Sequence, residues 1–105
     1  MVQDVKKRKV VVICGSYRFE RLMHEIAQRL ELEKGYAVIG VLPHVLNRDL
    51  TEEEKELLGE IHLCKIDLAD SVYIVNPDGY IGDSVRREME YAREKGKEIL
   101  CFCEK

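Results

Sequence analysis

The stretch Val72–Glu88, which reads VYIVNPDGYIGDSVRRE, decides the fold that this sequence predicts. It begins as an apolar strand, passes through a turn that contains glycines, and continues as a helix. Glycine lets the backbone bend and approach a ligand closely. The first N–H groups of a helix have no partner inside the helix, so they can bind an anion. The stretch therefore predicts a strand–loop–helix unit with a ligand-binding loop.

Strands and helices alternate along the rest of the chain. Apolar runs predict strands, and apolar residues at helical spacing predict the helices between them. The expected strands are Lys9–Cys14, Tyr36–Val41, Ser71–Asn76 and Glu98–Cys103, and the expected helices run from about Arg18 to Glu33, from Thr51 to about Asp70, and from Asp83 or Ser84 to Gly96. With right-handed crossovers, this alternation predicts an α/β fold: a three-layer doubly wound sandwich whose four-stranded parallel sheet has the order 2-1-3-4.

The second helix has a clear start and an expected buried face. Thr51 and Glu54 form a capping box, in which each side chain accepts a backbone N–H of the other residue. Apolar residues further along give the expected buried stripe, which contains Leu57, Leu58, Ile61 and Cys64.

The third helix carries an unusual carboxylate. Its expected buried stripe contains Val85, Met89 and Ala92, and Glu88 lies at the edge of that stripe instead of on the solvent side. Glu88 also comes too late in the helix to belong to a capping box. A boundary glutamate that the helix dipole stabilises explains the position as well as a functional carboxylate does.

Composition limits the functions that the chain can have. The 105 residues suit a single domain, 1–105, with residues 1–8 as a basic arm. The net charge of −3 argues against nucleic-acid binding. The sequence contains no apolar run of membrane-spanning length and no visible signal peptide, so we expect no membrane partner and a cytoplasmic location.

The cysteines indicate neither a metal site nor a disulfide. Cys14, Cys64, Cys101 and Cys103 form no C-x-x-C pair, and spacing places no further ligands beside them. In a buried strand a cysteine behaves as a small apolar residue. We therefore expect no metal and no cofactor.

The predicted strand order brings two loops to one crevice. In a sheet of order 2-1-3-4 the switch point lies between the first and third strands, where their carboxyl ends open onto a common site. Those ends are Cys14-Gly15-Ser16 and Asn76-Pro77-Asp78-Gly79. Neither loop has the G-x-G-x-x-G or P-loop pattern, which disfavours dinucleotide or triphosphate binding of the standard kind.

Four motifs resemble the nucleoside 2-deoxyribosyltransferase-like superfamily, which includes the deoxynucleoside-monophosphate N-glycosidases. They are Cys14-Gly15-Ser16-Tyr17-Arg18, Ala69-Asp70-Ser71-Val72, Glu88-x-x-x-Ala92 and Lys97-Glu98-Ile99-Leu100. In that family the first motif holds the phosphate and sugar of a nucleotide, and the glutamate of the third is the nucleophile. Within the superfamily the chain is most similar to a small bacterial branch with His62-x-x-Lys65-Ile66-Asp67 and Gly79-Tyr80-Ile81-Gly82 patterns.

The chain also departs from this family. A catalytic aspartate of the glycosidases falls at His62 here, so the acid/base pair is incomplete. Phe19-Glu20-Arg21 replaces the glycine-rich nucleotide loop, and the extension after the last strand is missing or very short.

The resemblance implies cleavage of an N-glycosidic bond, in which a carboxylate stabilises or traps an oxocarbenium-like sugar. Glu88 is the candidate carboxylate, and Tyr80 is a candidate donor that positions it. His62 could be the general acid near neutral pH, although packing against the sheet explains it slightly better. Asp78 or Asp83 could act only with a raised pKa, and N-capping is the better explanation of Asp83.

The remaining candidates are expected to bind substrate. Ser16, Arg18 and Ser84 would hold a phosphate or sugar hydroxyls, and Tyr17 and Tyr80 would stack on a base. Alternatively, Arg18 is an ordinary exposed arginine of a first helical turn, and the two tyrosines are aromatic residues at the edge of the core. The other expected substrate-binding residues are Gly15, Asp78, Gly79, Gly82 and Asp83.

Three hypotheses follow. The first is a hydrolase or transferase acting on the N-glycosidic bond of a small-molecule nucleoside or nucleotide. The second is a non-catalytic nucleotide-binding or sensing module, which the absence of aspartate at position 62 favours. The third is a receiver-like interaction domain, which ranks last because no acidic cluster follows the first strand. A homo-oligomer is expected, because a neighbouring subunit often closes the pocket in this superfamily.

Overall fold

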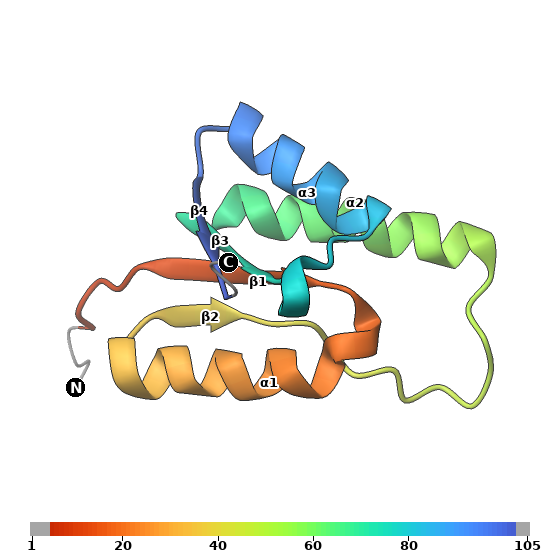
Figure 1. Cartoon of the computed structure of the whole chain (residues 1–105), viewed down its shortest axis with the longest axis horizontal. Coiled ribbons are helices and arrows are strands. Elements are labelled where there is room, and N and C mark those ends of the chain that lie inside the picture. The colour runs from red at the N-terminus through yellow and green to blue at the C-terminus, as the bar shows by residue number, and fades with distance from the viewer. Residues whose placement is uncertain (1–4, 103–105) are drawn as a thin grey trace.

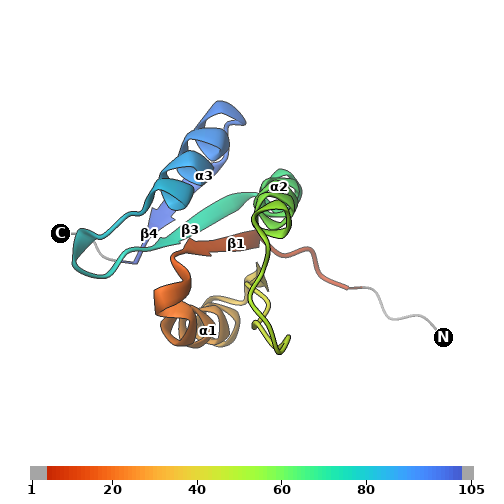
Figure 2. The ribbon, with the colours of Figure 1, turned by 90° about the vertical axis from the view of Figure 1, so that its right-hand side faces the viewer.

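The computed structural model describes residues 5–102, which form a four-stranded, fully parallel sheet between two layers of helices (Figures 1 and 2). The sheet has the order β2-β1-β3-β4, which confirms the predicted three-layer α/β fold. The strands are β1 (Val10–Gly15), β2 (Ala37–Ile39), β3 (Ser71–Val75) and β4 (Glu98–Cys101). The two central strands are the longest and are covered on both faces, which is why they read as continuous apolar runs.

Helices cover the two faces unequally. In Figure 2 α1 (Glu20–Arg29) lies on one side of the sheet, and α2 (Glu52–Leu68) and α3 (Asp83–Glu94) lie on the other. A short 3-10 turn, η1 (Tyr17–Phe19), precedes α1, and a π-helical segment, η2 (Leu30–Lys34), continues it to Gly35. A second 3-10 turn, η3 (Pro77–Gly79), lies between β3 and α3.

The core is divided into two clusters by the sheet itself, because successive residues of a strand point to opposite faces. On the α1 side, Ile13 and Val75 pack with Met23, Ile26 and Leu30. On the other side, the buried set includes residues of β1, β3, α2 and α3: Val12, Cys14, Ile66, Ala69, Val72, Ile74, Val85 and Ala92. Cys14 therefore faces the layer formed by α2 and α3.

The predicted buried stripe of α2 is wrong. Leu57, Leu58 and Ile61 are 54%, 46% and 39% exposed, and Cys64 is exposed as well. The face that meets the sheet instead contains Ile66, which is fully buried, with the partly buried His62 and Leu63. These residues lie three to four positions apart, so they do share one helix face. The error arose because that face includes a histidine, whereas the solvent face carries more leucine and isoleucine.

The start of α3 also differs from expectation. Gly82 is the N-cap, without a side-chain cap, and Asp83 is the first helical residue, so N-capping by Asp83 or Ser84 is wrong. Both side chains are exposed in the first turn, where a negative Asp83 is favoured by the helix dipole. The expected buried stripe of this helix is confirmed, because Val85 and Ala92 are buried and Met89 is partly buried.

The outer strands are shorter than predicted. β2 ends at Ile39 and β4 at Cys101. Cys101 is exposed because β4 is an edge strand, so its assignment as a buried strand cysteine is wrong. Cys103 and residues 1–4 of the expected basic arm lie outside the described residues. Within residues 5–102, no helix has the length and apolar character that crossing a membrane requires.

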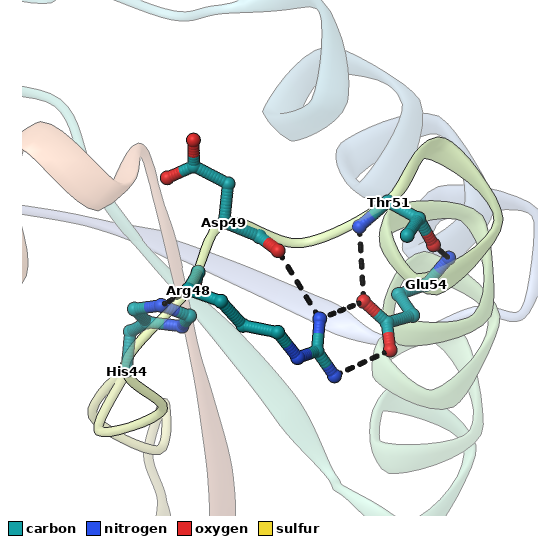
Figure 3. Close-up of polar contacts among 5 residues, drawn as sticks. All are labelled: His44, Arg48, Asp49, Thr51 and Glu54. Atoms are coloured by element: carbon teal, nitrogen blue, oxygen red, sulfur yellow. Dashed lines mark hydrogen bonds and ion pairs between the residues drawn. The ribbon is translucent and has the colours of Figure 1, made fainter.

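The long connection before α2 is tied to the start of that helix (Figure 3). The Arg48 guanidinium donates to both carboxylate oxygens of Glu54, at 2.8 and 2.9 Å, and His44 Nε2 lies 3.0 Å from the Arg48 carbonyl oxygen. Thr51 and Glu54 form the predicted capping box, which is therefore confirmed. Hydrogen bonds from Arg48 and from the Thr51 backbone lower the pKa of Glu54 to about 2.

The corrected face of α2 predicts unequal effects of one substitution at two sites. Ile66→Ala should lower the free energy of unfolding by about 2–5 kcal/mol, because it leaves a cavity in a closed core. Ile61→Ala, the matched control on the solvent face, should change it by less than about 1 kcal/mol. Urea denaturation followed by circular dichroism measures both. Equal losses would contradict the assignment of the buried face.

Candidate functional site

The two glycine-bearing bends meet at the carboxyl edge of the sheet. Gly15 of β1 pairs in parallel register with Val75 of β3, so Ser16 and Asn76 leave the sheet side by side. This juxtaposition is the one that the predicted strand order requires. All the candidate site residues that precede α1 or α3 therefore lie near one edge.

Gly15 has a packing role. A Cβ at this position would lie 2.7 Å from the Met23 sulfur and 3.3 Å from the Val75 Cβ and carbonyl oxygen. A side chain at this position would therefore displace Met23 and press against Val75. This contact explains the glycine without a ligand, so the predicted substrate-binding role of Gly15 has no independent support from its surroundings.

The second bend is shaped by two consecutive left-handed residues. Asp78 has φ 55° and Gly79 has φ 77°, and Asp and Gly are residues that tolerate this region. The Gly79 N–H donates to the Asn76 carbonyl at 2.9 Å, and Tyr80 N–H donates to that of Pro77 at 3.0 Å. The turn projects Asp78, Gly79 and Tyr80 into solvent.

An exposed group of aromatic and arginine side chains joins the two bends. The Tyr80 ring packs edge-on against Phe19, with centroids 5.9 Å apart, and the Arg18 guanidinium lies over the Tyr80 ring at 4.8 Å. Tyr17 is 52% exposed and Tyr80 is 43% exposed. The Tyr17 hydroxyl donates to the Leu42 carbonyl at 2.8 Å, which ties its ring to the connection after β2. We call Tyr17, Arg18, Phe19 and Tyr80 the stacking surface.

The remaining polar candidates have structural contacts or open surroundings. The Ser16 hydroxyl accepts a hydrogen bond from the Arg18 N–H at 3.4 Å, which caps the short turn that leads into α1. Gly82 begins α3, and its Cα faces the Tyr80 hydroxyl. Tyr80 makes its described contacts with Phe19 and Arg18, so its predicted role as a donor to Glu88 lacks a contact in the structure.

Glu88 does face inward, toward a group that sequence spacing did not bring together. Its Oε1 lies 3.6 Å from His62 Nε2, and the same nitrogen lies 3.3 Å from the Cys14 sulfur. The side chains of His62 and Glu88 are only 13% and 15% exposed, and Cys14 is fully buried. Glu88 Oε1 has no hydrogen-bond partner among the described residues. We call Cys14, His62 and Glu88 the buried triad.

Burial shifts the pKa of each group of the buried triad toward its neutral form. Desolvation raises the pKa of Glu88 to about 7, opposed by the nearby Cys14 side chain and by the charge of Arg87. Desolvation lowers the pKa of His62 to about 4, helped by the nearby charge of Lys65. Burial also raises the pKa of Cys14 well above its usual value. His62 is therefore not the acid poised near neutral pH that its position suggested.

The buried triad has the composition of a metal-binding group. One ligand atom from each of the three side chains lies within 4.8 Å of the other two. Cys14 was the residue that sequence reasoning missed, because it ends an apolar strand and reads as part of the core. Its partners come from α2 and α3, 48 and 74 residues later in the chain, so no local spacing could have indicated the group.

The fold and the site together define a doubly wound α/β domain with an open aromatic surface and a buried polar group at one edge. No protein-family model matches this chain. A protein of Thermococcus onnurineus (strain NA1) named "DNA-binding protein" is 26% identical over 94 residues, which cover 90% of this chain and 80% of that protein.

This relationship corrects the predictions that rested on the family resemblance. The assignment to the nucleoside 2-deoxyribosyltransferase-like superfamily is wrong, because the relative's name points to DNA binding and no family model supports the resemblance. Three further predictions are corrected with it. They are the hydrolase or transferase acting on an N-glycosidic bond, the alternative of a nucleotide-binding module, and a small-molecule nucleoside partner with no nucleic acid.

Two of the four motifs that carried the resemblance have folding roles here. Asp70 accepts a hydrogen bond from the Val10 N–H at 2.8 Å and so joins β1 to the start of β3. Glu98 accepts from the Ser71 hydroxyl and pairs with Lys9, both at 2.6 Å. These contacts join neighbouring strands of the sheet, and they carry no information about substrate.

The raised pKa of Glu88 predicts a pH-dependent stability that its amide analogue lacks. A folded-state pKa above the unfolded value stabilises the protein at low pH, and this contribution is lost as the pH rises through about 7. Between pH 5 and 8 in chelating buffer, Glu88→Gln should therefore gain on the order of 2–3 kcal/mol in unfolding free energy relative to the native chain. Denaturant unfolding at both pH values measures the difference. If the variant and the native chain differ by the same amount at both pH values, folding does not raise the pKa of Glu88.

Proposed function

We propose that this protein binds single-stranded DNA at the carboxyl edge of its sheet, with bases stacked on the stacking surface. The observation that carries the proposal is the exposure of Tyr17 and of Tyr80, whose ring lies beneath the Arg18 guanidinium, in a chain whose relative is named a DNA-binding protein. Stacking on aromatic rings needs unpaired bases, which a single strand offers and a duplex does not.

Charge supports this mode over duplex binding. The chain has a net charge of −3 and a pI near 5.6, whereas duplex-binding domains usually carry a strongly basic face. Several cations are also paired with carboxylates, including Lys9 with Glu98 and Arg48 with Glu54. A phosphate-driven mode would therefore be weak, and stacking would supply most of the binding free energy.

The cations available at this edge are few but well placed. Arg18 forms no ion pair within residues 5–102, and its guanidinium lies over the Tyr80 ring. Arg21 is in the first turn of α1, and Arg86 and Arg87 are in the first turns of α3. Both helices begin at the carboxyl edge, so these arginines would accompany the phosphates of a strand that crosses the stacking surface.

The net charge of −3 does not exclude binding of this kind, for a physical reason. Net charge averages over the whole surface, whereas binding depends on the field and the stacking area where the ligand lies. A cytoplasmic location, expected from the sequence, forms part of the proposal.

Fluorescence anisotropy with a labelled mixed-sequence oligonucleotide tests the proposal. Tyr80→Ala should weaken single-strand binding by about 5- to 150-fold, because one base–aromatic stack contributes about 1–3 kcal/mol. Arg29→Ala, at the far end of α1, is the control and should leave binding unchanged, since Arg29 pairs with Glu25 away from the stacking surface. The same sequence as a duplex should bind more weakly. Stronger duplex binding, or undiminished binding by Tyr80→Ala, would contradict the proposal.

Salt dependence gives a second, independent prediction. Between one and four arginine contacts to phosphate should give a slope of log K against log salt between about −0.7 and −3 for single-stranded DNA. Measuring affinity across a series of potassium chloride concentrations gives the slope. A much steeper slope would indicate a phosphate-driven interface elsewhere on the surface.

A further inference from the structure

The geometry points to a zinc site formed by Cys14, His62 and Glu88, with a fourth coordination position left open. The inference departs from the expectation of no metal that the cysteine spacing supported. It does not rest on DNA binding, because a metal ion can be titrated into the protein without any nucleic acid.

The three groups converge on one point from three elements. Cys14 comes from β1, His62 from α2 and Glu88 from α3. Their sulfur, nitrogen and oxygen atoms all lie within 4.8 Å of one another. Zn²⁺ bonds of about 2.3 Å to sulfur and about 2.0 Å to nitrogen or oxygen, at tetrahedral angles, would separate S from N by about 3.6 Å and N from O by about 3.3 Å. The observed S–N separation is 3.3 Å and the observed N–O separation is 3.6 Å, each about 0.3 Å from these values, and S and O lie within 4.8 Å of each other.

A proton relay would need a different arrangement. In a nucleophile–His–acid relay the two partners use different ring nitrogens, so that the acid orients the base. Here the Cys14 sulfur and Glu88 Oε1 both approach the same atom, His62 Nε2. A shared nitrogen suits one central cation, toward which a lone pair from each of the three groups can point.

The unsatisfied oxygen of Glu88 supports the same conclusion. Glu88 Oε1 has no hydrogen-bond partner in the described part of the chain, and its atom is inaccessible to solvent. A buried acceptor left unsatisfied costs about 1–3 kcal/mol. Coordination would remove this penalty. It would also replace the thiol and carboxyl protons, which pass to the buffer as the ion binds.

The donor set selects the metal. Thiolate, imidazole and carboxylate together suit Zn²⁺, whereas Mg²⁺ and Ca²⁺ prefer oxygen ligands alone. The charges of a thiolate and a carboxylate would balance those of Zn²⁺, which suits a site surrounded by apolar residues such as Val12, Ile66 and Val85. Three protein ligands leave one position open, which is the coordination of zinc sites that bind water or a substrate.

Calorimetric titration of zinc chloride into the reduced, chelator-treated full chain tests the site. We expect one Zn²⁺ per chain, and Co²⁺ in its place should show a thiolate charge-transfer band together with the visible bands of a tetrahedral ion. Glu88→Gln and Cys14→Ser should each weaken Zn²⁺ binding by about 100-fold or more, since even losing a residue that only orients a ligand weakens zinc sites 10- to 100-fold.

The other cysteines supply the matched control. A variant with Cys64→Ser, Cys101→Ser and Cys103→Ser keeps Cys14 as the only thiol, and it should bind Zn²⁺ like the native chain. Circular dichroism of Glu88→Gln separates loss of the ligand from loss of the fold. No uptake by the native chain, uptake that Glu88→Gln leaves intact, or uptake that disappears in the triple variant would each overturn the inference.

Discussion

Parallel pairing of β1 with β3 is the constraint on which the rest of the molecule depends. The register joins Val11 to Ser71 at one end and Gly15 to Val75 at the other. Because both strands are buried on both faces, their backbone groups have no access to water and must pair with each other. That register places the two bends side by side and directs alternate residues of β1 into different layers. Ile13 packs toward α1, and Cys14 packs toward α2 and α3.

The site has two parts at different depths. The stacking surface is open to solvent and is assembled by the turns after β1 and β3. The buried triad lies beneath α2 and α3, where Glu88, with its raised pKa, and His62, with its lowered pKa, face a buried thiol. Packing alone does not favour an unpaired carboxyl in such a place, since an apolar residue of similar size would avoid the desolvation penalty. A carboxyl group that is buried despite this desolvation penalty is a candidate for function.

The family resemblance illustrates how folding contacts can imitate a functional signature. Asp70 and Glu98 each hold neighbouring strands together through the backbone of Val10 and the side chains of Ser71 and Lys9. Contacts of this kind contribute to the fold, whatever the chain binds. Residues explained in this way carry little weight in assigning activity. Tyr80 and Glu88 lack such explanations, and they are where the proposals concentrate.

The sequence by itself determined the element order, the parallel sheet and its 2-1-3-4 arrangement, because apolar runs, helical spacing and the Thr51 capping box are local signals. It also indicated that Glu88 leaves the solvent face of its helix. Only the tertiary structure decided which face of α2 is buried, because His62 takes a core-facing position that Leu57 and Leu58 on the same helix do not. It alone joined Cys14 to His62 and Glu88, since their proximity arises from a strand and two helices packing together and has no counterpart in sequence spacing.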